Sequence, residues 1–145
     1  MILPDVFNNS GIPALEKMLS FTQARQKMLA ENIANVDTPG YRIKQLDPAK
    51  FQTALRQAVD NQKAAGPSAA LELPGTDQFS TDASGLLKVK PSLEPAENVL
   101  FHDGTNVRIE RQMAMMAENA MMHQTAAELL RNKYECLTKA IQGRS

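Results

Sequence analysis

The sequence has few of the residues that build a dense core or a chemical site. Its 145 residues contain no Trp, two Tyr, five Phe and a single Cys. One cysteine, Cys136, excludes a disulfide within the chain and fits no zinc-ligand spacing. Sixteen basic side chains balance sixteen acidic ones. Because there is no excess positive charge, nothing indicates a nucleic acid or an anionic membrane as partner.

Long apolar runs and export signals are missing as well. No run of 18 or more apolar residues occurs, so we expect no membrane-spanning helix. Residues 1–13 have neither a basic region nor a continuous apolar stretch, so we expect no Sec-type signal peptide.

Candidates for catalysis are equally scarce. His102 and Asp103 are adjacent, but neighbours in sequence seldom point at one another. His123 and Cys136 are 13 residues apart on one expected helix, too far along it for a catalytic pair. The sequence therefore predicts no enzyme, no catalytic residue, no metal or cofactor site and no small-molecule substrate.

The C-terminal third carries the strongest pattern. From Ile109 onward, apolar residues recur at alternating steps of four and three, which predicts a long helix with one narrow seam. Gly143 stands where such a helix is expected to end. The seam consists of Ile109, Met113, Met116, Ala120, His123, Ala127, Leu130, Tyr134, Leu137 and Ile141.

A second helix is predicted for residues 15–35. Asn9 or Ser10 suits its N-cap and Pro13 its first turn. A narrow seam cannot be buried by its own helix, so we expect the two terminal helices to pair. The N-terminal seam consists of Leu15, Leu19, Thr22, Gln26, Leu29, Ile33 and Val36.

The middle of the chain has a different composition. Five prolines and three glycines interrupt residues 43–103. We expect a short helix within residues 51–62, a brief strand within 85–90 and a linker at 60–78. The predicted fold is mainly α, with the terminal helices forming a coiled-coil-like hairpin around a poorly ordered, partly β insert. Its parts are residues 1–42, 43–105 and 106–145, and the first and last form one helical domain.

The first helix is predicted to end in a tight turn. In "NVDTPGYR", Pro39 disfavours helical backbone at Thr38. Pro-Gly at the two central places fits a type II turn, in which Gly40 takes a positive φ. Tyr41 can then cover the end of the helix. Backbone preferences alone therefore predict a turn at these residues.

The same residues resemble a known signature. "NIANVDTPGYR" is similar to the motif that follows the first helix of bacterial flagellar rod and hook proteins. The C-terminal end, from "DGTNVRIERQM" to "KAIQG", resembles that of the proximal-rod proteins of the FlgB type. One departure is His123, at a place where such chains usually have an aromatic residue. The motif residues are Asn32, Ile33, Ala34, Asn35, Thr38, Pro39, Gly40 and Tyr41.

The resemblance implies a structural subunit of the flagellar basal-body rod. Such a subunit self-assembles through its terminal helices into the proximal part of the axial drive shaft and is needed for motility. Its implied partners are itself, other rod proteins, the rod-to-MS-ring junction and the flagellar type III export apparatus. Export from the cytoplasm to the periplasm-spanning rod then needs no Sec signal.

The residues themselves leave one alternative open, a small helical-hairpin adaptor or chaperone that binds a partner helix in its seam. A rod subunit is expected to polymerise with rising concentration, whereas an adaptor is expected to stay a monomer or dimer. The expected assembly interface consists of Leu15, Leu19, Leu29, Ile33, Met113, Met116, Ala120, Ala127, Leu130, Tyr134, Leu137 and Ile141.

Overall fold

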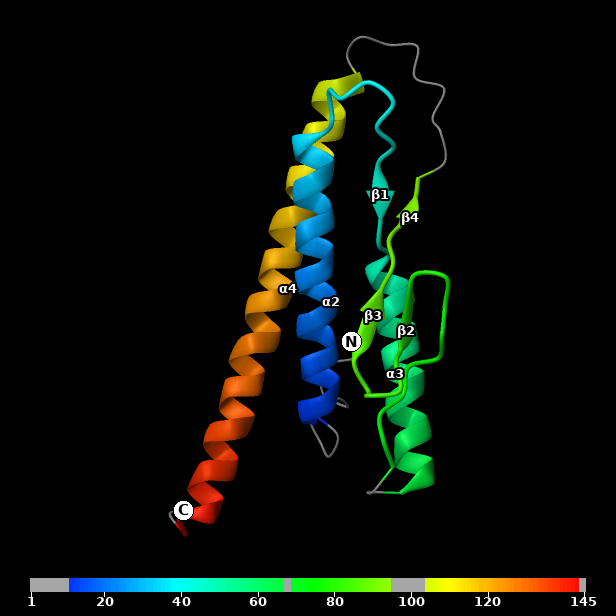
Figure 1. Cartoon of the computed structure of the whole chain (residues 1–145). Helices are drawn as coiled ribbons and strands as arrows, with labels where there is room; N and C mark the ends of the chain where they lie inside the picture. Colours follow the sequence, from blue (N-terminus) through cyan, green and yellow to red (C-terminus); the bar gives the residue numbers. More distant parts are fainter. Residues whose placement is uncertain (1–10, 67–68, 95–103, 144–145) are drawn as a thin grey trace.

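The chain folds into two long helices at its ends and a smaller α/β insert between them (Figure 1). The computed structural model describes residues 11–66, 69–94 and 104–143. For residues 104–107 it describes the backbone but not the side chains. The elements are α2 (Gly11–Ala34), β1 (Lys44–Gln45), α3 (Pro48–Ala65), β2 (Phe79–Thr81), β3 (Leu87–Val89), β4 (Ser92–Leu93) and α4 (Gly104–Ile141). The mainly helical fold with paired ends and a partly β insert is confirmed.

Helix α2 lies in the middle of the molecule, with α4 on one side and the insert on the other (Figure 1). The two long helices run antiparallel. α4 has 38 residues and α2 has 24, which correspond to lengths of about 57 Å and 36 Å. Consequently the C-terminal end of α4 continues beyond the first turn of α2. No helix in the described part of the chain is long and apolar enough to cross a membrane.

Helix ends follow the local sequence signals. Pro13 lies in the first turn of α2, as expected. Asp47 caps α3 by accepting a hydrogen bond from the Ala49 N–H at 2.8 Å, and Pro48 follows as the first helical residue. At the far end of α4, Gly143 takes a φ of 63°. The two candidate caps Asn9 and Ser10 lie outside the described residues, and so do His102 and Asp103.

An aromatic cluster joins α2 to the insert. The rings of Phe21 and Phe51 stack with centroids 4.1 Å apart, and Phe79 meets both rings edge-on. All three side chains are fully buried. Aromatic pairs of this geometry add to the stabilisation from burial. The main core is therefore between α2 and the insert.

The insert is more ordered than its composition indicates. The short helix expected within residues 51–62 is confirmed, and it continues to Ala65. The prediction of a linker over residues 60–78 is wrong, because Leu71 and Leu73 are buried in the core. Small and polar residues dominate that segment, so two isolated leucines gave no periodic signal.

Two small antiparallel sheets complete the insert. β2 pairs with β3 and β1 pairs with β4, so the strand expected within residues 85–90 is confirmed as β3. The buried Gln78 ties the two sheets together. Its Oε1 accepts from the Asp47 N–H at 3.1 Å, and its Nε2 donates to Ser92 Oγ at 2.6 Å. The insert is thus fixed against the end of β1.

The contact line between α2 and α4 coincides with the predicted seam only in part. Met113, Ala120, His123 and Ala127, which the heptad pattern placed in the seam, are exposed. The pattern was misleading because the contact line includes polar and small side chains. The side chains on that line, buried or half-buried, are Gln112, Met115, Asn119, Met122, Ala126, Leu129 and Lys133.

The start of α4 is also earlier than predicted. The seam was predicted from Ile109 and the C-terminal helical part from residue 106, but the helix already includes Gly104.

Candidate assembly interface and turn motif

Asn32 is the centre of the motif that follows the first helix. Its side chain is fully buried near the end of α2. Its Nδ2 donates to the Lys44 carbonyl at 2.7 Å and to Gln112 Oε1 at 3.1 Å. Its Oδ1 accepts from the Tyr41 hydroxyl at 2.9 Å and from the Lys44 N–H at 3.0 Å. One amide thus satisfies all its hydrogen-bonding groups and joins α2, the turn, β1 and α4.

The turn that brings Tyr41 back to Asn32 has the expected geometry. The Tyr41 N–H donates to the Thr38 carbonyl at 3.1 Å. Pro39 and Gly40 occupy the two central places, and Gly40 has a φ of 77°. A positive φ at the second central residue is the mark of a type II turn. The predicted turn is therefore confirmed.

The other motif residues stabilise the end of α2. Asn35 Nδ2 donates to the Glu31 carbonyl at 2.8 Å, and the Thr38 N–H donates to the Asn35 carbonyl at 2.9 Å. Ile33 is half-buried, whereas Ala34 is exposed as the last residue of the helix. These local bonds satisfy carbonyl groups that the helix end leaves free.

An ion pair lies beside Asn32. Lys44 Nζ is 3.0 Å from Glu31 Oε2, and this contact lowers the pKa of the Glu31 carboxyl and raises the pKa of the Lys44 amino group. Burial raises the pKa of the Tyr41 hydroxyl, so the hydroxyl keeps its proton and remains a donor to Asn32. The protonation states therefore favour the observed bonds.

Polar groups also dominate the contact between the two long helices. The buried Asn119 donates to the Thr22 carbonyl at 2.8 Å and to Gln26 Oε1 at 2.9 Å. His123 Nδ1 lies 2.7 Å from Thr22 Oγ1. His123, which stands where related chains usually have an aromatic residue, thus has a polar partner, Thr22, on α2. Hydrogen bonds of this kind specify which positions face each other.

The structure divides the expected assembly residues into three groups. Leu15 and Leu29 are buried within the chain's own core. Four others are half-buried, namely Leu19, Ile33, Met116 and Leu130. Six are exposed, namely Met113, Ala120, Ala127, Tyr134, Leu137 and Ile141. The sequence placed them in two seams, one on each terminal helix, whereas the fold leaves half of them exposed.

The exposed group forms an apolar line along α4. Leu137 is 48% exposed and Ile141 is 85% exposed. Isolated exposed apolar residues are common on protein surfaces, whereas larger contiguous apolar patches often serve contacts with other molecules. Met121 is also exposed.

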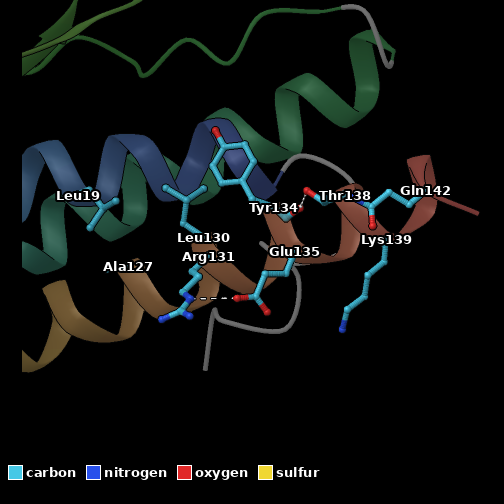
Figure 2. Close-up of a pocket in the computed structure, with 9 residues that line it drawn as sticks. All are labelled: Leu19, Ala127, Leu130, Arg131, Tyr134, Glu135, Thr138, Lys139 and Gln142. Carbon is cyan, nitrogen blue, oxygen red and sulfur yellow. Dashed lines mark hydrogen bonds and ion pairs between the residues drawn. The ribbon is translucent and has the colours of Figure 1, made fainter. Parts of the chain in front are cut away.

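A shallow groove crosses the contact between α2 and the end of α4 (Figure 2). It has a volume of about 680 Å³. Leu19 of α2 and Leu130 of α4 form its apolar floor, and Tyr134 points across toward α2. The Tyr134 hydroxyl lies 3.3 Å from Glu16 Oε1. The groove is therefore continuous from the half-buried pair Leu19 and Leu130 to Tyr134, which belongs to the exposed apolar line.

Polar side chains border the groove on α4. Arg131 Nε is 3.0 Å from Glu135 Oε1, an i,i+4 ion pair that Figure 2 draws as a dashed line. The described residues contain no group of three or more His, Cys, Asp or Glu placed to hold a metal ion. An apolar floor with a charged border is suited to a protein contact.

Comparison with known proteins connects this geometry to a family. Residues 19–42 match the family model described as "Flagella basal body rod protein". This range contains the last four turns of α2 and the whole turn around Gly40. Over 125 residues the chain is 30% identical to the flagellar basal body rod protein FlgB of Aeromonas hydrophila, covering 86% of this chain and 87% of that protein. The chain belongs to the FlgB family.

Other FlgB proteins give the same result. The FlgB of Bacillus subtilis is 29% identical over 132 residues, which is 91% of this chain and 93% of that protein. The FlgB of Borrelia hermsii is 30% identical over 116 residues. Because the matches include both terminal helices and the insert, the resemblance noted in the two end motifs extends through the chain. The chain is a structural rod protein of the flagellar basal body, not an enzyme.

Proposed function

We propose that this FlgB-family chain builds the proximal part of the flagellar rod by self-association through its two terminal helices. The observation that supports the proposal is the exposed apolar line on α4, which ends at Ile141 with 85% exposure. Leu137 and Ile141 belong to the C-terminal end of α4, which continues beyond the first turn of α2, so the described part of the chain leaves them exposed. Burial against other subunits would remove them from water.

The proposed partners follow from the same role. They are further copies of this chain, other rod proteins, the rod-to-MS-ring junction and the flagellar type III export apparatus. In this proposal the subunit leaves the cytoplasm through that apparatus, unfolded and without a Sec signal. The hydrogen-bonded contact of α4 with α2 supports this, because polar contacts contribute modest net stability and separate readily in water.

The adaptor alternative is less consistent with the family. An adaptor would bind a partner helix in the groove next to Leu130 and would not polymerise. Membership in a family of rod proteins favours self-assembly, and concentration-dependent association of the purified chain separates the two.

A pair of neighbouring substitutions tests the proposed interface. Ile141→Asp places a charge on the apolar line, whereas Ala140→Asp places the same charge at an exposed position off that line. Both lie at the end of α4, so their effect on the helix itself is similar. We expect Ile141→Asp to weaken self-association at least tenfold and to abolish swimming, and Ala140→Asp to change neither strongly.

Sedimentation of the purified chains and microscopy of swimming cells give the two readouts. Equal association of both variants would remove the C-terminal part of α4 from the interface. Circular dichroism checks that each variant keeps its helices.

A further inference from the structure

The turn between β2 and β3 is fixed by its own hydrogen bonds. The Asp82 carboxylate accepts from the Ser84 N–H at 2.9 Å, from the Leu86 N–H at 3.0 Å and from the Ser84 hydroxyl. The Asp82 N–H donates to the Leu86 carbonyl at 2.9 Å, and the Gly85 N–H donates to the Asp82 carbonyl at 3.0 Å. Gly85 has a φ of 80°, which glycine adopts at little steric cost. The backbone of residues 82–86, called the hairpin tip below, therefore has one well-defined conformation.

Lys17 ties the hairpin tip to α2. Its Nζ donates to the Gly85 carbonyl at 2.7 Å, and the lysine is only 7% exposed. Burial lowers the pKa of the Lys17 amino group, because a charged group loses hydration there. Removing an ammonium group from water costs free energy, and here the group is spent on a turn that lies outside the buried core. The long helix thus sets the position of the hairpin tip.

Leu86 is the large apolar side chain that the hairpin tip presents to solvent. It is 66% exposed. A single exposed leucine is common on protein surfaces, but the backbone that carries this one is held both by Asp82 and by Lys17. A group that is already fixed before binding loses little conformational freedom when a partner buries it. The hairpin tip is therefore suited to anchor a contact with another protein surface.

The hairpin tip and the groove of Figure 2 flank the same part of α2. Lys17 holds the tip, and Leu19 forms part of the groove floor. Two residues of an α-helix that are two positions apart differ by about 200° around the axis and by about 3 Å along it. The tip and the groove therefore lie at nearly the same level on different sides of α2, and Figure 1 shows the insert and α4 on opposite sides of this helix. The tip of a chain does not line the groove of the same chain.

We propose that the hairpin tip of one copy enters the groove of a neighbouring copy, where Leu86 packs on Leu19 and Leu130. This contact rests on the proposed self-assembly. The groove is continuous with Tyr134 of the exposed line on α4, the surface proposed for that assembly. Because two different surfaces meet, the contact is heterologous, and its repetition builds a ring or an open helical array instead of a closed dimer. Side-by-side copies in a rod require a contact of this type.

Disulfide trapping between chains tests which surfaces meet. Cys136 is exposed, so every chain first carries Cys136→Ser. One chain then carries Ala83→Cys in the hairpin tip, and the other carries Lys139→Cys at the border of the groove. Oxidation of this mixture should give several times more mixed dimer than a control mixture in which Arg56→Cys, at an exposed position of α3, replaces Ala83→Cys. Dimers of two Lys139→Cys chains in place of mixed dimers would show that a groove faces a groove, and would overturn the proposal.

A charge on the hairpin tip tests the role of Leu86. Leu86→Asp should weaken self-association by about tenfold or more, because the contact would bury the new carboxylate. Leu93→Asp, at another exposed leucine of the insert, should change association little. Sedimentation measures both variants, and circular dichroism checks that they fold. Association that is insensitive to Leu86→Asp, with no excess of mixed dimers, would overturn this contact and leave the proposed rod assembly standing. A chain that does not associate at all would overturn both.

Discussion

The two terminal helices have the same kind of apolar pattern but different surroundings. α2 is enclosed on two sides, by α4 and by the insert, and ten of its residues are buried. α4 touches the rest of the chain along one line, and its C-terminal turns are exposed. Hydrophobic positions in α2 are therefore used within the subunit, whereas several in α4 are not.

This difference gives the chain a core of its own and a separate exposed apolar surface. The aromatic cluster around Phe21 provides a core that needs no second copy. The exposed line that includes Leu137 provides apolar surface that the chain itself does not cover. In the proposed assembly, α2 maintains the subunit and α4 connects subunits.

The largest contrast is expected from truncating one apolar residue in each helix. Phe21→Ala removes a fully buried ring and should lower the free energy of unfolding by about 3–5 kcal/mol. Leu137→Ala removes a half-exposed side chain and should cost less than about 0.5 kcal/mol in the monomer. Urea denaturation of dilute protein measures both. Similar losses would show that α4 is packed as tightly as α2.

Asn32→Ala should produce the next largest effect. It leaves the Tyr41 hydroxyl, the Lys44 backbone and Gln112 without their shared partner, at a cost of about 3 kcal/mol. Asn35→Ala is the matched control, because that half-buried amide bonds mainly within its own helix end, and it should cost below about 1 kcal/mol. Urea denaturation compares the two. Equal costs would show that the motif serves the helix end alone.

Substitutions in the turn are expected to have a smaller effect on stability. Gly40→Val should cost about 1–2 kcal/mol, because valine is strained at a φ of 77°. A Cβ atom added at Gly40 or at Gly75 would meet no neighbouring atom within 4 Å, and of these two glycines only Gly40 has a positive φ. Gly75→Val is therefore the control for size, and Thr38→Ser is the mild change within the motif.

Thermal melting measures the three variants. We further expect Gly40→Val subunits to be secreted but not to enter the rod, since the error in chain direction recurs in every copy. Normal incorporation into purified basal bodies would assign the motif another role.

The smallest effect is expected from the ion pair beside the turn. The lowered pKa of Glu31 means that its pairing with Lys44 stabilises the fold above the ordinary carboxyl pKa of 4.5 and is lost as the pH falls through the lower folded value. Glu31→Gln should therefore melt slightly below the native chain at pH 7, and this difference should shrink as the pH falls below 4.5. A melting difference independent of pH would exclude the pair as its cause.

The sequence predicted the elements of the fold better than their contacts. Periodicity identified both long helices, and the Pro39–Gly40 pair identified the turn. The contact line of α4 was predicted only in part, because it depends on Gln112 and Asn119, whose hydrogen bonds carry no hydrophobic signal. Only the tertiary structure reveals such partners, since they come from residues far apart in the chain.

The turn motif was also predicted in position but not in its contacts. The motif indicated that residues 32–41 matter, but not that one buried amide, Asn32, joins four segments of the chain. The burial of Arg25 in α2, where it is only 3% exposed, gave no signal in the sequence, because a lone arginine in a helix is most often exposed. Burial and hydrogen bonding at these two positions depend on how the insert folds back onto α2.

An electron cryo-microscopy map of the rod, resolved to side chains, tests the central claim most directly. We predict that Tyr134, Leu137 and Ile141 pack against neighbouring subunits, while Asn119 remains hydrogen-bonded to α2 of its own chain. A map in which these three side chains face solvent, or in which Asn119 contacts a different subunit, would contradict the division of labour between the two helices.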